Sequence, residues 1–193
     1  MKTTSVTPEE MARRTARFGK LDSYQQQHAA AAGIPAAAFA GIAANKIFPV
    51  LAPAAYQGRA GMAAVKGAPG LVITIAECPP GDGAGLHAHE QSIENFFCLN
   101  GRFEIAWGDD GYDCTILEPL DFISIPPGVC RSFKNISNET ARLLVIIQIE
   151  GAEQADRVHH SPKMGAEIAE KFGKDTVDAL NRIGFKFDAG VTG

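Results

Sequence analysis

The stretch GDGAGLHAHEQSIENFFCLNG, residues 81–101, places two histidines two apart and a carboxylate close behind them. Glu94 follows His89 by five residues, and His87 precedes His89 by two. In a β-strand, residues two apart point to the same face, so the two imidazoles lie side by side. A tight bend after His89 leaves enough chain for a carboxylate on the next strand to reach both rings. The spacing therefore predicts one polar cluster shared by two neighbouring strands.

Two imidazoles and one carboxylate are the facial ligand set that suits Fe(II), and Mn, Ni, Co or Zn can use the same donors. The alternative is that His87 and His89 pair with Glu94 without a metal. The spacing alone leaves both interpretations open. If Glu94 faces inward, the period of two turns Phe96 inward as well.

Short strand-like runs surround this stretch. They are LVITIAE, IENFFCLN, GRFEIAW, DCTIL, DFISI and ARLLVIIQIE, which fall between residues 71 and 150 and are separated by Gly, Asp, Asn and Pro. GDDGY at 108–112 predicts a hairpin in which Gly111 takes positive φ. Many short strands at near-regular spacing predict an antiparallel sandwich or barrel.

The two ends of the chain have sequence patterns that favour helices rather than strands. Thr7 and Glu10 with Pro8 between them form a capping box, which predicts a helix from residue 7 to about 18. Residues 29–64 are rich in alanine and broken by Gly and Pro, which favours short helices and irregular chain. Two amphipathic runs after residue 161 predict helices. We therefore expect an N-terminal extension at 1–69, a barrel at 70–150 and a C-terminal helical extension at 151–193.

The composition excludes several functional classes. With 46% hydrophobic and 21% charged residues, the 193-residue chain resembles a globular protein, and its net charge of -4 argues against a nucleic-acid partner. No apolar stretch predicts a signal peptide or a membrane partner, so we expect a cytoplasmic protein. The four cysteines lack a CxxC spacing and are predicted to be buried free thiols. The adjacent His159 and His160 are expected in an exposed loop, since neighbouring side chains point apart.

Residues 81–101 match the first motif of the cupin superfamily without a gap, at Gly81, His87, His89, Glu94 and Gly101. LDFISIPPGVCRSFKN, residues 120–135, matches the second motif at Pro126, Gly128 and Asn135. The chain thus resembles a cupin over residues 70 to 150. The resemblance implies a mainly β fold, a jelly-roll-like double-stranded β-helix barrel with added N- and C-terminal helices. It also implies a homodimer and a metal or substrate site in the barrel lumen.

Two positions depart from the second motif. Leu120 stands where glycine is usual, and Arg131 stands where the fourth metal ligand, a histidine, is usual. A guanidinium has no lone pair to donate, so Arg131 is not a ligand. At ~5 Å and an effective dielectric of ~20, its charge would oppose a divalent ion by about 7 kcal/mol before screening.

Two arrangements resolve this conflict. In one, His87, His89 and Glu94 hold a divalent transition metal (Fe, Mn, Ni, Co or Zn), and Arg131 binds an anionic group of a small-molecule ligand. Phe96 and Phe133, which share the inward parity, would contact that ligand, although core packing alone would place them there equally well. In the other, Arg131 pairs with Glu94 and leaves a metal-free pocket.

These arrangements correspond to two functions. The resemblance implies a metal-dependent cupin acting on a small organic, anionic molecule, with dioxygenase-like chemistry ahead of a lyase or isomerase reaction. The alternative is a non-catalytic, metal-free cupin that binds a small ligand. Besides Glu94, which the metal would occupy, no residue suggests a general base, so the sequence assigns no catalytic residue.

Overall fold

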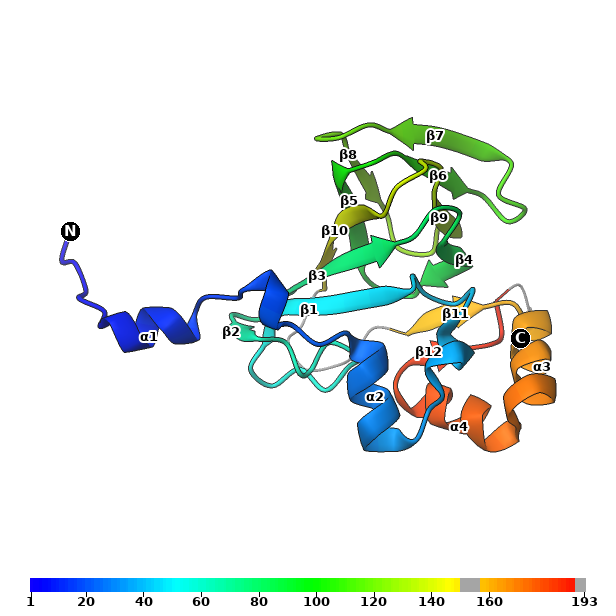
Figure 1. Ribbon diagram of the computed structural model, residues 1–193, viewed down its shortest axis with the longest axis horizontal. Helices are drawn as coiled ribbons and strands as arrows, with labels where there is room; N and C mark the ends of the chain where they lie inside the picture. Colours follow the sequence, from blue (N-terminus) through cyan, green and yellow to red (C-terminus); the bar gives the residue numbers. More distant parts are fainter. Residues whose placement is uncertain (150–156, 190–193) are drawn as a thin grey trace.

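Two six-stranded sheets form the body of the protein in a computed structural model that describes residues 1–149 and 157–189 (Figure 1). The first sheet has the order β2 (Val65–Gly67), β1 (Lys46–Pro53), β3 (Leu71–Cys78), β10 (Ala141–Gln148), β5 (Ile93–Asn100) and β8 (Phe122–Ile125). The second has the order β12 (Phe185–Lys186), β11 (Val158–His160), β4 (Gly83–His89), β9 (Arg131–Asn135), β6 (Phe103–Trp107) and β7 (Asp113–Leu117).

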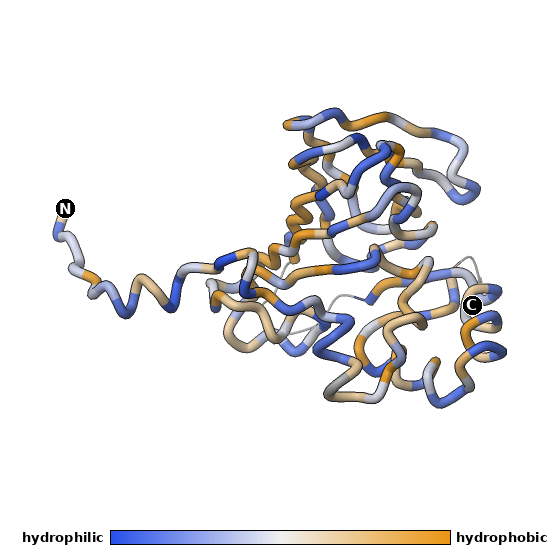
Figure 2. The backbone as a smooth tube through the Cα atoms, in the orientation of Figure 1, coloured by the Kyte–Doolittle hydropathy of each residue, from blue (hydrophilic) through white to orange (hydrophobic). Residues whose placement is uncertain are grey.

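The strands of the barrel alternate between buried and more exposed residues, as a half-buried strand must. β3 shows this most regularly, with every second side chain buried. Buried residues from both sheets meet in a shared barrel core, which includes Phe96, Phe103, Ile105 and Leu143. Figure 2 shows the corresponding hydrophobic runs along the barrel strands. The predicted fold class, a mainly β double-stranded β-helix barrel with helices at both ends, is confirmed.

Within residues 1–149 and 157–189, four α-helices and two short 3₁₀ helices lie outside the barrel: α1 (Pro8–Arg13), α2 (Tyr24–Ala32), α3 (Pro162–Phe172), α4 (Lys174–Arg182), η1 (Phe18–Lys20) and η2 (Ala36–Phe39). The predicted capping box is present, since the Thr7 side chain accepts from the Glu10 backbone and the Glu10 side chain accepts from the Thr7 backbone. However, α1 ends at Arg13, buries no residue and stands away from the barrel in Figure 1.

The N-terminal extension contains more strand than its alanine-rich sequence predicts. The structure corrects the expected helical and irregular chain at 29–64, because residues 46–51 of β1 pair with β3 and add to the first sheet. Gln25 on α2 ties the helix to this region, donating to the Ala44 carbonyl and accepting from the Ile47 amide. β11 and β12 extend the second sheet in the same way, so both extensions continue the barrel sheets.

The extension also touches the strand that carries the two histidines. The Gly85 amide donates to the Gly41 carbonyl at 2.7 Å. A β-carbon on Gly85 would lie only 2.7 Å from that oxygen, so a larger residue would separate the two segments. Glycine at position 85 of β4 therefore allows the segment around Gly41 to pack closely against the strand.

The turn before β8 contains Leu120, one of the two departures from the cupin motif. Leu120 has a φ of 76°, in the left-handed region that glycine adopts without cost. Pro119 precedes it, and the Asp121 amide donates to the Glu118 carbonyl at 3.0 Å, which together describe a type II turn. The backbone therefore keeps the geometry of the glycine although the residue has changed.

The expectation that all four cysteines are buried needs correction. Cys78 and Cys98 are buried free thiols as predicted, but Cys114 is exposed and Cys130 is partly exposed. β7 lies at the edge of its sheet, which leaves Cys114 on an uncovered face.

Of the helices in the described part of the chain, none combines the length and hydrophobicity that crossing a bilayer requires.

Candidate metal and ligand site

His87 and His89 lie on the same inward face of β4, and both side chains are buried. His87 Nδ1 lies 2.7 Å from the Gly85 carbonyl oxygen, and His89 Nδ1 lies 2.8 Å from Ser92 Oγ. Since a carbonyl only accepts, His87 carries its proton on Nδ1 and keeps the lone pair of Nε2. The hydrogen-bonded Nδ1 and available Nε2 are the arrangement of a histidine prepared to bind a metal.

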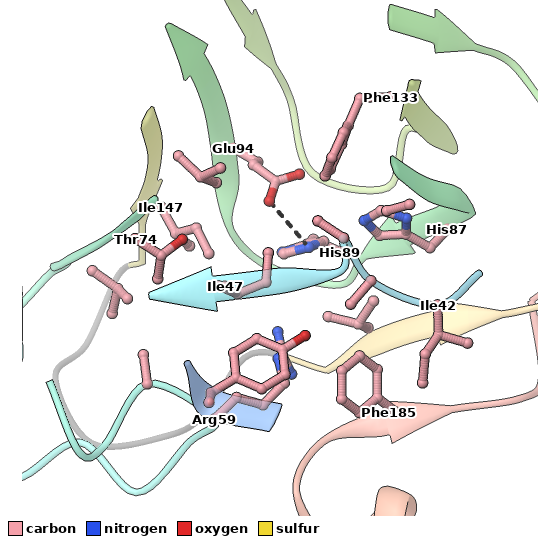
Figure 3. Close-up of a pocket in the computed structure, with 18 of the residues that line it drawn as sticks. Ile42, Ile47, Arg59, Thr74, His87, His89, Glu94, Phe133, Ile147 and Phe185 are labelled. Carbon is pink, nitrogen blue, oxygen red and sulfur yellow. Dashed lines mark ion pairs between the residues drawn. The ribbon is translucent and has the colours of Figure 1, made fainter. Parts of the chain in front are cut away.

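Glu94 lies at the start of β5 and faces the two rings, as Figure 3 shows. Its Oε1 is 3.7 Å from His89 Nε2, and one ligand atom from each of the three residues lies within 4.8 Å of the others. The predicted cluster of His87, His89 and Glu94 is therefore present. Ligand atoms around a bound metal lie roughly 3 Å apart, given metal–ligand distances of about 2.1 Å, so the trio would contract on binding.

Arg131 occupies the position opposite His87 in the β4–β9 pairing. Its Nε and Nη2 donate to Glu94 Oε2 at 2.9 and 2.6 Å, and its Nη1 lies 3.4 Å from the carbonyl oxygens of His87 and Val129. Only 1% of the residue is exposed. The guanidinium thus replaces the fourth ligand and holds one oxygen of Glu94, while the other oxygen faces His89.

The electrostatics of the cluster keep Glu94 charged and His87 neutral. Burial alone would raise the pKa of Glu94, but Arg131 and then His89 outweigh it, so that the pKa is lowered. Burial, followed by the positive charge of Arg131, lowers the pKa of His87 well below its usual value. A carboxylate and a neutral imidazole are the protonation states that bind a metal ion.

A third histidine borders the cluster, which the sequence did not predict. His160 lies on β11 directly opposite His87, with ring centroids 5.1 Å apart and 0% exposure. The expected exposed loop at His159 and His160 is wrong, because the run VHH pairs with β4 and its alternation turns His160 inward. The half-buried His159 instead lies 2.6 Å from Asp188.

His160 is held neutral by its surroundings. Burial, and after it the charge of Arg59, lowers its pKa to about 3. Neither ring nitrogen has a hydrogen-bond partner among the described residues; the Leu86 carbonyl is close enough to favour protonation but lacks hydrogen-bond geometry. The neutral imidazole of His160 therefore packs against the ring of His87.

A cavity of about 80 Å³ opens beside the cluster and lies between the barrel and both extensions. Most of its wall is apolar: Ile42, Ala43, Ala44, Ile47, Ala60, Val72, Ala84, Phe133, Val145, Ile147, Val158 and Phe185. The polar lining residues are Tyr24, Tyr56, Arg59, Thr74, His87, His89 and Glu94. Phe133 lies on the wall, whereas Phe96 and Arg131 are fully buried and are not among the described lining residues.

The family follows from a comparison with known protein families, in which the model of the cupin domain matches residues 74–147. Residues 74–147 form a cupin domain. This range contains both motifs, including Arg131 in place of the fourth ligand. No protein of curated function matches the chain.

Solved structures similar to the cupin domain include three of different origin. The cupin domain of Cnp3 from Schizosaccharomyces pombe has 22% identity and a TM-score of 0.40, covering 44% of this chain and 60% of that one. A putative sugar phosphate isomerase from Acidithiobacillus ferrooxidans has 26% identity and a TM-score of 0.41, covering 51% and 60%. A protein from Thermus thermophilus has 18% identity and a TM-score of 0.44, covering 70% and 97%. The alignments thus span three fifths of the length of the first two.

Proposed function

We propose that this protein is a metal-dependent cupin that acts on a small anionic organic molecule. The observation that carries the proposal is the arrangement of His87, His89 and Glu94. Both rings are anchored through Nδ1, and Glu94 keeps one oxygen toward His89 while Arg131 holds the other. Two nitrogens and one oxygen suit Fe, Mn, Co, Ni or Zn.

The charge balance of the cavity supports an anionic ligand. Among the described lining residues, Glu94 is the only acid. The charge of Glu94 is already matched by Arg131, so a divalent ion bound by the trio would leave this end of the cavity positive. An anionic group on the ligand would offset this charge.

A bound metal would supply a Lewis acid or a site for dioxygen. Around it, Glu94 and the two histidines hold the coordination geometry, and the apolar wall, including Phe133, excludes water from the ligand. Oxygen chemistry of the dioxygenase type is our first expectation for the reaction. A lyase or isomerase reaction at the same site is the second.

Metal analysis tests this function directly. We expect protein purified without chelators, then exposed to Fe²⁺, Mn²⁺, Co²⁺, Ni²⁺ or Zn²⁺ and desalted, to retain about one equivalent of one of these ions. His87→Ala should lose it, whereas His159→Ala, on the neighbouring strand but outside the trio, should keep it. Wild-type protein that retains none of the five ions would refute metal dependence.

The ion pair of Arg131 with Glu94 favours a second candidate, a metal-free cupin that binds a small ligand. Here the guanidinium takes the place of the metal and neutralises Glu94. This candidate predicts that His87→Ala folds and binds ligand normally, while Glu94→Gln destabilises the barrel. The homodimer implied by the family resemblance stays a prediction, which sedimentation analysis would test.

A further inference from the structure

His160 is a fully buried imidazole whose two ring nitrogens have no hydrogen-bond partner among the described residues. A neutral imidazole has one N–H donor and one acceptor nitrogen, and leaving both unsatisfied inside a protein is costly. The ring packs near Phe185 and Phe187, with centroids 5.9 and 6.1 Å away, and such packing needs an aromatic ring but no nitrogen. A ligand from outside the chain would give the acceptor nitrogen a partner.

The strand order places His160 on one side of His87 as it places Arg131 on the other. β4 lies between β11 and β9 in the second sheet. His160 on β11 and Arg131 on β9 are each paired directly with His87 on β4. Directly opposite residues of antiparallel strands point to the same face, with β-carbons about 4.5–5.5 Å apart. The position that lost its ligand on β9 thus has a counterpart on β11.

The face of β11 that carries His160 is also the face that meets the cavity. Val158, two residues earlier, shares the buried face and lines the cavity, whereas His159 between them lies on the more exposed face. β11 is paired with β4 on one side and with β12 on the other. The backbone of His160 is therefore held in place, and only its side chain has to move to reach a ligand.

The separation of the His160 and His87 rings suits two ligands of one ion. Two imidazoles bound at about 2.1 Å, at angles between roughly 90° and 109°, have ring centroids about 4.5–5.2 Å apart. The centroids of His87 and His160 are 5.1 Å apart, and those of His87 and His89 are 5.5 Å apart. The group of ligand atoms that lies within 4.8 Å comprises His87, His89 and Glu94 without His160. His160 must therefore turn about its side-chain bonds to join them, which breaks no hydrogen bond of the ring to the described chain.

We propose that His160 is the fourth protein ligand of the metal, in the role that Arg131 cannot fill. This inference rests on the proposed function, since it adds a ligand to the trio of His87, His89 and Glu94. The ligand set becomes three imidazoles and one carboxylate, which suits the same transition metals. A fourth donor also offsets part of the repulsion that Arg131 exerts on the ion. The C-terminal extension is thereby a part of the metal site.

Metal affinity tests this assignment. Zn²⁺ and Co²⁺ are titrated into chelator-treated, dialysed full-length protein in competition with a chromophoric chelator. His160→Phe keeps an aromatic ring and removes both nitrogens. We expect it to weaken binding by more than about a hundredfold, because losing a group that only orients a ligand already costs about 10–100-fold. His159→Phe, the same change on the other face of β11, should bind as wild type does.

X-ray absorption at the edge of the bound metal provides a readout that does not depend on affinity. Scattering from the outer atoms of each ring counts the imidazoles on the ion. We expect three imidazoles in wild type and in His159→Phe, and two in His160→Phe loaded at saturating metal. Near-ultraviolet circular dichroism and thermal unfolding with chelator present establish that each variant is folded.

Two results would overturn the inference. One is a folded His160→Phe that binds both ions as tightly as wild type does. The other is a wild-type ion that carries only two imidazoles, which would reduce His160 to a packing or positioning role even if its removal lowers the affinity. The wild-type spectrum decides the question by itself where His160→Phe does not fold.

The same samples separate failure of this inference from failure of the proposed function. If wild type retains an ion with two imidazoles and His87→Ala loses it, metal dependence stands and His160 is not a ligand. If wild type retains none of the five ions, metal dependence fails and the assignment of His160 fails with it.

Discussion

Arg131 places two hydrogen bonds, of 2.6 and 2.9 Å, on a single oxygen of Glu94, and the other oxygen of that carboxylate lies 3.7 Å from His89 Nε2. One carboxylate is thereby shared between a permanent cation and the imidazole of His89. The sharing keeps the trio together without a metal and weakens its attraction for one. It is the feature of this barrel that most distinguishes it from the cupin motif.

Replacing Arg131 with histidine should increase metal affinity. The change removes a positive charge beside the ligands and supplies the fourth imidazole of the motif, so we expect Zn²⁺ or Co²⁺ to bind at least about tenfold more tightly. Calorimetric titration of chelator-treated, dialysed protein measures this. Arg131→Gln, which removes only the charge, should give a smaller increase; equal affinity in all three proteins would contradict the electrostatic account.

The buried ion pair should show strong coupling between Arg131 and Glu94. Arg131→Gln leaves a buried carboxylate without its partner, and we expect it to lower the free energy of unfolding by about 3–5 kcal/mol in the presence of chelator. The double variant Arg131→Gln/Glu94→Gln should recover a large part of this loss. Urea unfolding of the four proteins gives the coupling energy, and strictly additive effects would show that the pair is not energetically linked.

Leu120→Gly should stabilise the protein although it removes a side chain. Leu120 adopts a φ of 76° and is 72% exposed, so the leucine pays a left-handed backbone penalty and contributes little packing. We expect a gain of about 1 kcal/mol in the free energy of unfolding. Leu120→Ala keeps the β-carbon and should give little of that gain. A less stable glycine variant would mean that the leucine makes a contact of compensating value.

His28 predicts a pH dependence in the extension. Burial, assisted by the charge of Arg59, lowers the pKa of His28 in the folded protein, although its hydrogen bond to the Arg59 carbonyl acts in the opposite direction. The unfolded chain then binds more protons below about pH 6.5, so the stability present above that pH is lost as the pH falls toward the folded pKa.

His28→Gln should reduce this loss, because an amide can donate to the Arg59 carbonyl without taking up a proton. The difference in unfolding free energy between wild type and the variant, measured from pH 7.5 to 5 with chelator present, isolates His28 from the other histidines. Parallel pH profiles for the two proteins would show that His28 titrates alike in both states.

The sequence alone determined the parts of this protein that depend on local periodicity. The period of two placed His87, His89 and Glu94 on inward faces, and the structure confirms their convergence. The hairpin with Gly111 at positive φ and the capping box at Thr7 are likewise set by a few neighbouring residues. The barrel followed from the spacing of short strands and from the cupin motifs.

Only the tertiary structure decided which side chains meet across the barrel. The pair of Arg131 with Glu94 joins residues 37 apart in sequence, and the stack of Arg59 on Phe185 joins the two extensions. His160 became a neighbour of His87 because β11 pairs with β4, although the sequence predicted an exposed loop at this position. Strand periodicity fixes the face that a side chain occupies, whereas its partners depend on strand order and register, which long-range packing sets.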